Sequence, residues 1–309
     1  MNIYIFAGKG GVGKTTSAAA FSLLLSEKLG RRVLVASIDP AHNLGDVLGV
    51  GLGGEPRRIL PRLYAAEVDY EAVVSRYMES LAERLRYLYR HLKVFNLEGF
   101  IGFLRYAPGV EENAVLEEIL RLLKGGGGFD DIVLDPPPTG MLLRILSLPL
   151  ASLQWVRGLM RLREEILKRR RMIVNATGEE IRVRVGGGEY RLPYEKGEDP
   201  VYRELASLEK SYSEAREALL GEATVILVVN PETLPLLEAK RTYEFLKRIG
   251  VRVGGLVVNK YREGAGEMLE KAREMFPGER MAVIPLMGEE PRGVERLRRL
   301  AGMLEELAP

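Results

Sequence analysis

A glycine-rich loop near the N-terminus constrains the fold of this chain more than any other feature. Residues 8–16 read Gly-Lys-Gly-Gly-Val-Gly-Lys-Thr-Thr, after the apolar run 3–7 and before residues 16–29, whose apolar side chains recur at helical spacing. Glycines let backbone N–H groups turn inward around phosphate oxygens, and the N-terminus of the following helix adds a favourable dipole. The segment therefore predicts a phosphate-binding loop between a strand and a helix.

The loop matches the Walker A pattern Gly-x4-Gly-Lys-Thr, in the strand–loop–helix context that supports such a match. Lys14 is expected to reach the β and γ phosphates, and Thr15 to place its hydroxyl on Mg²⁺. The loop residues expected to bind nucleotide are Gly8, Lys9, Gly10, Gly11, Val12, Gly13, Lys14, Thr15 and Thr16. The alternative is a dinucleotide fold, because Gly-x-Gly-x-x-Gly also fits. That alternative needs Asp39 as the ribose partner and leaves Lys14 and Thr15 unexplained.

Composition excludes several chemistries. The 309 residues are 46% hydrophobic and 28% charged with a net charge of +2, which is typical of a soluble globular protein and does not indicate nucleic-acid binding. There is no cysteine and only two histidines, so thiolate chemistry is impossible and a histidine-built metal site is disfavoured. No signal peptide or membrane-spanning run is evident, which predicts a cytoplasmic protein. The scarcity of cysteine and glutamine suggests a thermophilic source.

Strand and helix patterns alternate along most of the chain. Short, continuously apolar runs predict six strands, at residues 3–7, 32–38, 132–134, 225–229, 253–258 and 281–284. Such strands with helices between them predict a doubly wound, mostly parallel α/β sheet within a single domain, 1–309. Residues 70–123 and 142–219 are expected to form an inserted helical subdomain. Within it, residues 172–192 are expected to contain a β-hairpin, with strands that include Ile173-Val174 and the alternating run 181–185.

Asp135 ends the apolar strand Ile132-Val133-Leu134. This is the Walker B arrangement, in which the carboxylate orients Mg²⁺ through a water molecule. A lone aspartate at a strand end is also common as a turn or helix-cap residue. The phosphate loop makes the metal-site interpretation the favoured one.

Three further segments carry a resemblance to a known family. The extra lysine of the loop, Lys9, is seen in the deviant Walker A group that includes MinD, ParA, the nitrogenase iron protein and ArsA. Residues 39–46, Asp-Pro-Ala-His-Asn-Leu-Gly-Asp, resemble switch I of the arsenite-pump (ArsA) and tail-anchored-protein targeting ATPases, and residues 135–144 resemble their switch II. The chain is thus similar to that family over most of its length, strongly in the nucleotide domain and weakly in the helical inserts.

The resemblance implies an ATP- and Mg²⁺-dependent homodimeric switch. Lys9 would reach the partner's nucleotide, and Asp46 would position the attacking water, a task that requires positioning rather than covalent help. Asn259 would read the adenine edge, with Pro285 and Leu286 packed near the base, and Glu238 would lie at a subunit or partner interface. Without the resemblance, Asn259 is explained equally well as a turn residue after a strand, and Glu238 is better explained as part of a solvated helix face.

The function of the switch remains open between three hypotheses. The favoured one is a chaperone for the hydrophobic transmembrane segment of a tail-anchored client, acting with a membrane receptor. Its groove would be lined by a set of helical-insert residues, each of which, taken singly, is better explained as part of the insert's own core: Phe100, Ile101, Phe103, Leu104, Leu148, Leu153, Trp155, Leu159 and Met160. The alternatives are an ArsA-like subunit that drives an anion or metalloid pump, and a ParA- or MinD-type positioning ATPase. The absence of cysteine disfavours both zinc clamping and thiolate arsenite sensing.

Overall fold

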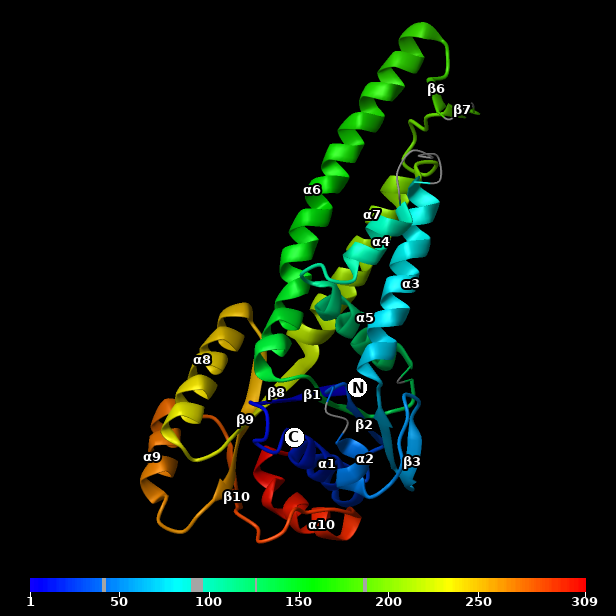
Figure 1. The fold of residues 1–309 in the computed structure, drawn as a ribbon. Helices are drawn as coiled ribbons and strands as arrows, with labels where there is room; N and C mark the ends of the chain where they lie inside the picture. Colours follow the sequence, from blue (N-terminus) through cyan, green and yellow to red (C-terminus); the bar gives the residue numbers. More distant parts are fainter. Residues whose placement is uncertain (41–42, 90–96, 126, 186–187) are drawn as a thin grey trace. The chain divides into compact units, whose positions relative to one another are not determined.

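The computed structural model describes residues 1–40, 43–89, 97–125, 127–185 and 188–309. A mixed sheet and a set of helices make up the chain (Figure 1). The strands are β1 Asn2–Ala7, β2 Val33–Ser37, β3 Arg57–Leu60, β4 Leu63–Glu67, β5 Asp131–Asp135, β6 Arg182–Val185, β7 Gly188–Arg191, β8 Ala223–Val229, β9 Arg252–Tyr261 and β10 Met281–Pro285.

The helices alternate with these strands over much of the chain. They are α1 Lys14–Leu23, α2 Leu44–Leu48, α3 Tyr70–Tyr89, α4 Leu97–Leu104, α5 Val110–Gly125, α6 Thr139–Thr177, α7 Pro200–Arg216, α8 Thr233–Ile249, α9 Gly266–Met275 and α10 Val294–Met303. Shorter helical turns are η1 Leu24–Lys28, η2 Glu217–Glu222 and η3 Glu305–Leu307.

Eight strands form one sheet in the order β10-β9-β8-β1-β5-β2-β4-β3. Every pairing in it is parallel except that of β3 with β4, which is antiparallel. The doubly wound, mostly parallel fold expected from the sequence is therefore confirmed, and all six predicted strands are present. In a parallel sheet the carboxyl ends of neighbouring strands meet at one edge. This brings the residues that follow β1, β2 and β5 together.

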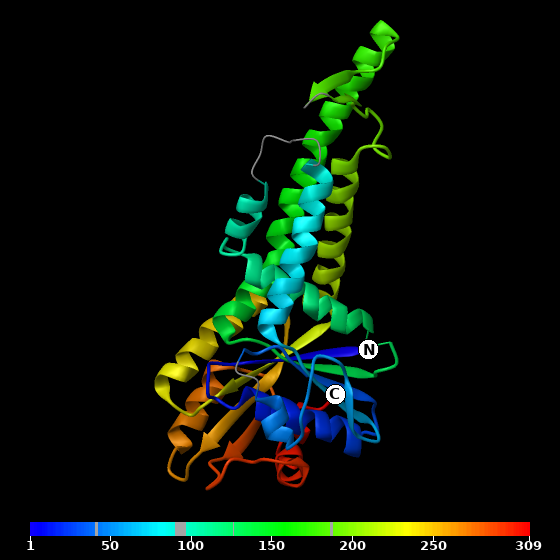
Figure 2. The same ribbon diagram turned by 45° about the vertical axis from the view of Figure 1, so that its right-hand side comes forward.

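Burial explains why these strands are continuously apolar. In β2 and β5 every residue is buried, as expected for strands covered on both faces. Helices α1 and α10 pack against each other on one side of the sheet, while α8 packs on β8 and β9 (Figures 1 and 2). Phe21 of α1 anchors that side, with its ring 5.0 Å from Tyr4 and 5.6 Å from Phe6 between centroids.

The described chain divides into two compact units. The first contains the whole eight-stranded sheet and consists of Met1–Val73, Val115–Leu146 and Glu217–Pro309. The second consists of Val74–Ala114 and Ser147–Arg216, in which the long helices α3, α6 and α7 lie side by side (Figure 2). Ion pairs join these helices: Arg157 of α6 binds Glu209 of α7 at 2.9 Å, and Arg84 of α3 binds Glu204 of α7 at 3.7 Å.

Two details of the sequence-based prediction are wrong. The hairpin is present as β6 and β7, but residues 172–177 belong to the last turns of α6, so the expected strand at Ile173-Val174 does not form. Strands β3 and β4 were not predicted. β3 opens with two exposed arginines, and the apolar run of β4, Leu-Tyr-Ala-Ala, contains no β-branched residue that would mark it as a strand.

Helix α6 has an unusual composition for a helix of this chain. Among the described residues it is the one helix long and apolar enough to cross a membrane by length and composition alone, a test that core helices of soluble proteins also pass. One third of its most apolar 18-residue stretch is buried within the protein. Its N-terminal turns contribute the core residues Leu142, Ile145 and Leu146.

Candidate nucleotide site

The phosphate loop connects β1 to α1 and lies wholly within the sheet unit. Its glycines are required by the geometry at two points. Gly13 has φ 94°, and a Cβ there would lie 2.2 Å from Asn259 Nδ2. A Cβ on Gly8 would lie 2.5 Å from the Val228 carbonyl oxygen. Around Gly10 and Gly11 nothing lies within 4 Å of the position of a Cβ, so this part of the loop is open to a ligand.

Lys14 is the first residue of α1 and is only 5% exposed. Its Nζ lies 3.4 Å from Oδ2 of Asp39, which follows β2 and is also largely buried. The predicted loop lysine and the predicted switch I aspartate are therefore brought together. The positive charge of the buried Lys14 ammonium is balanced by the Asp39 carboxylate when no nucleotide is bound. The ammonium can exchange this carboxylate for a phosphate oxygen of similar charge.

Asp135 lies at the end of β5 and is fully buried. Thr15 Oγ1 donates a hydrogen bond to its Oδ2 at 2.7 Å, and Ser37 Oγ donates to the same oxygen at 3.0 Å. Burial raises the pKa of Asp135 to about 6, against the opposing effects of the Thr15 hydrogen bond and the Lys14 charge. Sequence reasoning missed Ser37, which the β2–β5 register places directly beside Asp135.

These residues fit a magnesium ion. The second carboxylate oxygen of Asp135, Oδ1, is buried without a hydrogen-bond partner in the described part of the chain. Mg²⁺ takes oxygen ligands, keeps several waters and is held by one or two protein groups plus phosphate. The Thr15 hydroxyl and the Asp135 carboxylate supply such groups. The described residues include no cluster of three His, Asp or Glu side chains that would hold a metal by itself.

Asn259 and its neighbour lie against the back of the phosphate loop. Asn259 is buried at the end of β9; its Nδ2 donates to the Val12 carbonyl at 2.7 Å, and its Oδ1 accepts from the Lys260 N–H at 2.9 Å. Lys260 Nζ donates to the Gly11 carbonyl at 2.7 Å. Sequence reasoning singled out Asn259 for the adenine edge and missed Lys260, although the two are adjacent. Pro285 and Leu286 are exposed at the end of the next strand, β10.

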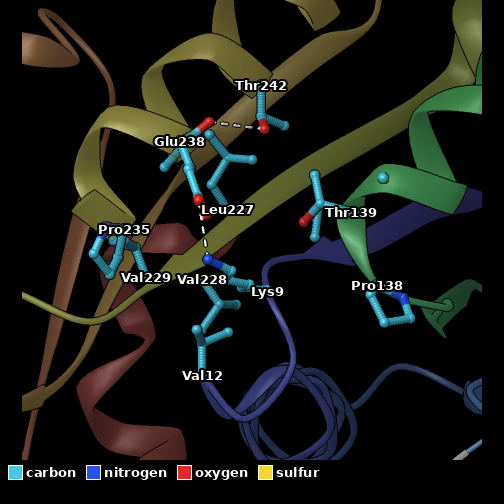
Figure 3. Close-up of a pocket in the computed structure, with 13 residues that line it drawn as sticks. Lys9, Val12, Pro138, Thr139, Leu227, Val228, Val229, Pro235, Glu238 and Thr242 are labelled. Carbon is cyan, nitrogen blue, oxygen red and sulfur yellow. Dashed lines mark hydrogen bonds and ion pairs between the residues drawn. The ribbon is translucent and has the colours of Figure 1, made fainter.

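Lys9, the extra lysine of the loop, is 63% exposed and pairs with Glu238 of α8 at 2.9 Å, as Figure 3 shows. The two side chains line a cavity of about 200 Å³. Switch II lines the same cavity through Pro138, Thr139 and Gly140. The loop lysine, the switch and helix α8 therefore meet at one place in the sheet unit.

Asp46 lies in the short helix α2 and is exposed. Switch I is anchored beside it, because Glu67 Oε1 accepts hydrogen bonds from the N–H groups of Leu44 and Gly45 at 2.7 and 3.3 Å. The remaining switch I residues Ala41 and His42 lie outside the described residues. The exposure of Asp46 leaves its carboxylate accessible to solvent water.

The parallel sheet, the phosphate loop after its central strand and the Thr15–Asp135 pair define a P-loop ATPase. The family described as anion-transporting ATPase matches residues 1–306, and the chain belongs to it.

Individual relatives carry two kinds of name. Arsenical pump-driving ATPase 2 of Aquifex aeolicus is 28% identical over 98% of this chain and 99% of its own length. An arsenical pump-driving ATPase of Chlorobaculum tepidum is 33% identical over 84% of this chain and 61% of its own length. ATPase GET3 of Chaetomium globosum is 29% identical over 97% of this chain and 89% of its own length. The resemblance to this family expected from the sequence is therefore confirmed.

Proposed function

We propose that this chain is a cytoplasmic, homodimeric ATPase that shields the transmembrane segment of a tail-anchored client protein on its way to the membrane. The observation that carries the proposal is an exposed apolar stripe on α6. Trp155, Leu159, Leu162 and Ile173 are 74%, 46%, 60% and 50% exposed. Their spacing of four, three and eleven residues keeps them on one helix face.

The stripe extends over most of the length of a membrane-spanning helix, with Arg169 and Arg170 between Leu162 and Ile173. From residue 155 to residue 173 an α-helix rises about 27 Å, and the hydrocarbon core of a bilayer is about 30 Å thick. Helix α4 of the same unit adds Phe100 and Phe103, which are 44% and 82% exposed. Large apolar side chains rarely gather on the surface of a monomeric soluble protein without a partner. A partner of matching chemistry is an apolar helix of about 20 residues.

The nucleotide site supplies the switch in this proposal. Lys14 binds the β and γ phosphates after leaving Asp39, and Asp46 positions the attacking water. Thr15, and Asp135 through a water molecule, would hold Mg²⁺, which would neutralise charge on the phosphates. Asn259 contacts the adenine edge through the second N–H of its amide, beside Pro285 and Leu286. Lys9 leaves Glu238 to reach the nucleotide of the partner subunit, which couples nucleotide state to dimer geometry.

A second candidate is a subunit that drives an anion or metalloid pump, because four relatives carry the name arsenical pump-driving ATPase. The chain has no cysteine to bind arsenite as a thiolate ligand. The client hypothesis accounts for the exposed apolar stripe of α6.

Capture of a membrane segment tests the proposal. The chain is co-expressed with a soluble carrier that ends in a 20-residue leucine–alanine segment, and the captured carrier is quantified. Leu159→Ser with Leu162→Ser should weaken capture at least about thirtyfold, since each serine removes an apolar contact of about 1–2 kcal/mol. The matched control changes exposed polar residues of the same helix, Arg161→Ser with Glu165→Ser, and should capture normally.

The outcomes separate the hypotheses. Equal capture by the serine pair and by its control would remove the α6 stripe as the client surface. Hydrolysis that rises with arsenite, but not with the apolar segment, would favour the pump subunit. Retention of the chain on DNA or on bare liposomes would favour a positioning ATPase.

A further inference from the structure

The end of strand β9 holds the phosphate loop by two side-chain hydrogen bonds. Asn259 Nδ2 donates to the Val12 carbonyl and Lys260 Nζ donates to the Gly11 carbonyl, each at 2.7 Å. Two consecutive loop carbonyls are thus bound by two consecutive residues of one strand. We propose that Lys260 is a positioning residue for the phosphates of ATP, which acts by fixing the orientation of the loop's peptide groups.

Because each peptide unit is planar, the hydrogen bonds to the Gly11 and Val12 carbonyls also fix the direction of the N–H groups that follow them in the loop. The C=O of one residue and the N–H of the next belong to one planar trans unit and point in opposite directions. A Gly11 carbonyl held toward Lys260 therefore turns the Val12 N–H away from Lys260, and the Val12 carbonyl held by Asn259 does the same for the Gly13 N–H. The Val12 N–H meets the Lys9 carbonyl only at 3.5 Å, a long contact that a charged phosphate oxygen can replace.

The backbone conformation of Lys260 indicates that its contact with the Gly11 carbonyl is maintained at a cost in conformational energy. Lys260 has φ 57° and is the one non-glycine residue at positive φ in the described part of the chain. This region is sterically unfavourable for a residue with a long side chain, and such conformations persist where the surroundings over-determine them. Here the Lys260 N–H is held by Asn259 Oδ1 at 2.9 Å, and the ammonium is held by the loop.

Charge distinguishes Lys260 from the two loop lysines. Lys14 pairs with Asp39 and Lys9 pairs with Glu238. Lys260 binds a neutral carbonyl, and within the described ranges no carboxylate forms an ion pair with it. Its positive charge therefore lies uncompensated next to a loop whose ligand carries several negative charges, which adds attraction to the hydrogen-bond geometry.

Strand β9 also connects the phosphate loop to the base side of the site. The Leu286 N–H donates to the Tyr261 carbonyl at 2.7 Å, and Tyr261 directly follows Lys260. A displacement of Lys260 is therefore expected to affect the phosphate side first, because its ammonium contacts the loop, whereas the base side is linked only through the backbone of Tyr261.

The test compares three substitutions at Lys260 in the full chain. Lys260→Met removes the ammonium and keeps the stem, Lys260→Gly also removes the backbone strain, and Lys260→Arg keeps the charge. The control, Lys210→Met, changes an exposed lysine of α7 in the other unit. Binding of ATP, ADP and AMP is measured by displacement of a fluorescent nucleotide. Amide exchange of the loop peptide covering residues 8–16 is measured without nucleotide.

Lys260→Met should weaken ATP and ADP binding about five- to tenfold, the scale of one lost hydrogen bond to a charged group. AMP, which lacks the phosphates bound by the loop, should bind within about twofold of the unchanged chain. Exchange of the loop peptide should become faster, while the melting temperature stays unchanged. Lys260→Gly should resemble Lys260→Met, and Lys260→Arg should lie between them and the unchanged chain.

Two results would overturn the proposal. The first is normal ATP affinity in Lys260→Met with unchanged loop exchange. The second is full recovery in Lys260→Gly, which would assign the effect to the backbone conformation rather than to the ammonium. Neither result bears on client capture, so the two proposals fail separately.

Discussion

At the scale of single residues, Asp135 combines its proposed role in holding Mg²⁺ with an electrostatic cost to the folded state. Its carboxylate is fully buried, and its pKa is raised to about 6 by that burial. The folded protein therefore binds this proton more tightly than the unfolded chain does. Stability from this group is present below about pH 4 and is lost as the pH rises to about 6. At neutral pH the Asp135 carboxylate of the nucleotide-free chain is ionised, and its buried negative charge destabilises the folded state.

Asp135→Asn should therefore stabilise the nucleotide-free chain at pH 7 by on the order of 2 kcal/mol, within the roughly 3 kcal/mol that the pKa change corresponds to. The amide oxygen keeps the hydrogen bonds from Thr15 and Ser37, and the NH₂ replaces Oδ1, which has no partner among the described residues. The gain should vanish near pH 4, while ATP hydrolysis should be lost. Urea unfolding at pH 4, 5, 6 and 7 measures the first effect.

Asp46→Asn is the matched control, because it neutralises an exposed carboxylate of the same predicted site. Its unfolding free energy should differ from that of the unchanged chain by less than about 0.5 kcal/mol at every pH. A stabilisation by Asp135→Asn that does not depend on pH would contradict the electrostatic explanation.

The residues that sequence reasoning found and missed differ in a physical way. Lys14, Thr15 and Asp135 follow from local spacing, because a phosphate loop needs consecutive residues and a Walker B aspartate ends a strand. Ser37 reaches Asp135 only through the pairing of β2 with β5, and Lys260 reaches Gly11 across 249 residues of sequence. No local pattern encodes such contacts. Asn259 of β9 was singled out from the sequence, whereas the adjacent Lys260 was not.

At the scale of elements, the sheet has an edge that the sequence did not reveal. β3 is the antiparallel edge strand, and Arg57 and Arg58 on it are exposed. An edge strand offers unpaired backbone groups to other chains, and charged side chains on it oppose such pairing. The same arginines hide the strand from a search for apolar runs. The charged side chains that oppose pairing at this edge are therefore also the reason that strand β3 was not predicted.

Arg57→Val with Arg58→Val should therefore promote aggregation with little effect on the ATPase rate. The two valines raise β-propensity and remove two charges at an exposed edge. Light scattering during heating should begin at a lower temperature than in the unchanged chain. The control pair Arg296→Val with Arg299→Val changes exposed arginines of helix α10, and an equally early onset in it would mean that lost charge alone explains the effect.

The end of α6 shows the opposite error. Ile173 and Val174 are β-branched and lie before a hairpin, so their intrinsic preference indicates a strand. In the structure α6 continues to Thr177, whose hydroxyl donates to the Ile173 carbonyl at 2.9 Å. A helix that already extends from Thr139 to Met172 adds each further residue without a new nucleation cost. Propagation therefore outweighs the local preference of two residues.

At the scale of the whole molecule, the nucleotide site lies entirely in the sheet unit, whereas the α6 stripe lies in the helical unit. Both units are built from separated stretches of chain, so each folds only when distant segments meet. The fold class was predictable because strand and helix periodicities are local and repeat along the chain. The function of the helical unit was not predictable, because the apolar residues of an exposed stripe and those of a buried core recur at the same helical spacing in the sequence.

Nucleotide-dependent dimerisation is the prediction that belongs to this scale. Asp46→Asn should bind ATP·Mg²⁺ and hydrolyse it slowly, which traps the closed state. Its mass in solution should rise from 34.5 kDa to twice that value when ATP·Mg²⁺ is added. Adding Lys9→Ala should return it to a monomer, because the cross-subunit contact is lost. Light scattering coupled to size exclusion measures both.

Glu238→Gln tests whether Lys9 acts in dimerisation or only stabilises the fold through its ion pair with Glu238. The Lys9–Glu238 pair is half exposed, so its loss should change the unfolding free energy by less than about 1 kcal/mol. Because Glu238 competes with the partner's nucleotide for Lys9, the substitution should lower the ATP concentration needed for dimerisation, and only when Lys9 is present. If Asp46→Asn stays a monomer with ATP·Mg²⁺ bound, the shared site is wrong. If Glu238→Gln promotes dimers to the same extent in a chain that also carries Lys9→Ala, then Glu238 does not compete with nucleotide for Lys9. Helix α8 would then affect the dimer interface in another way.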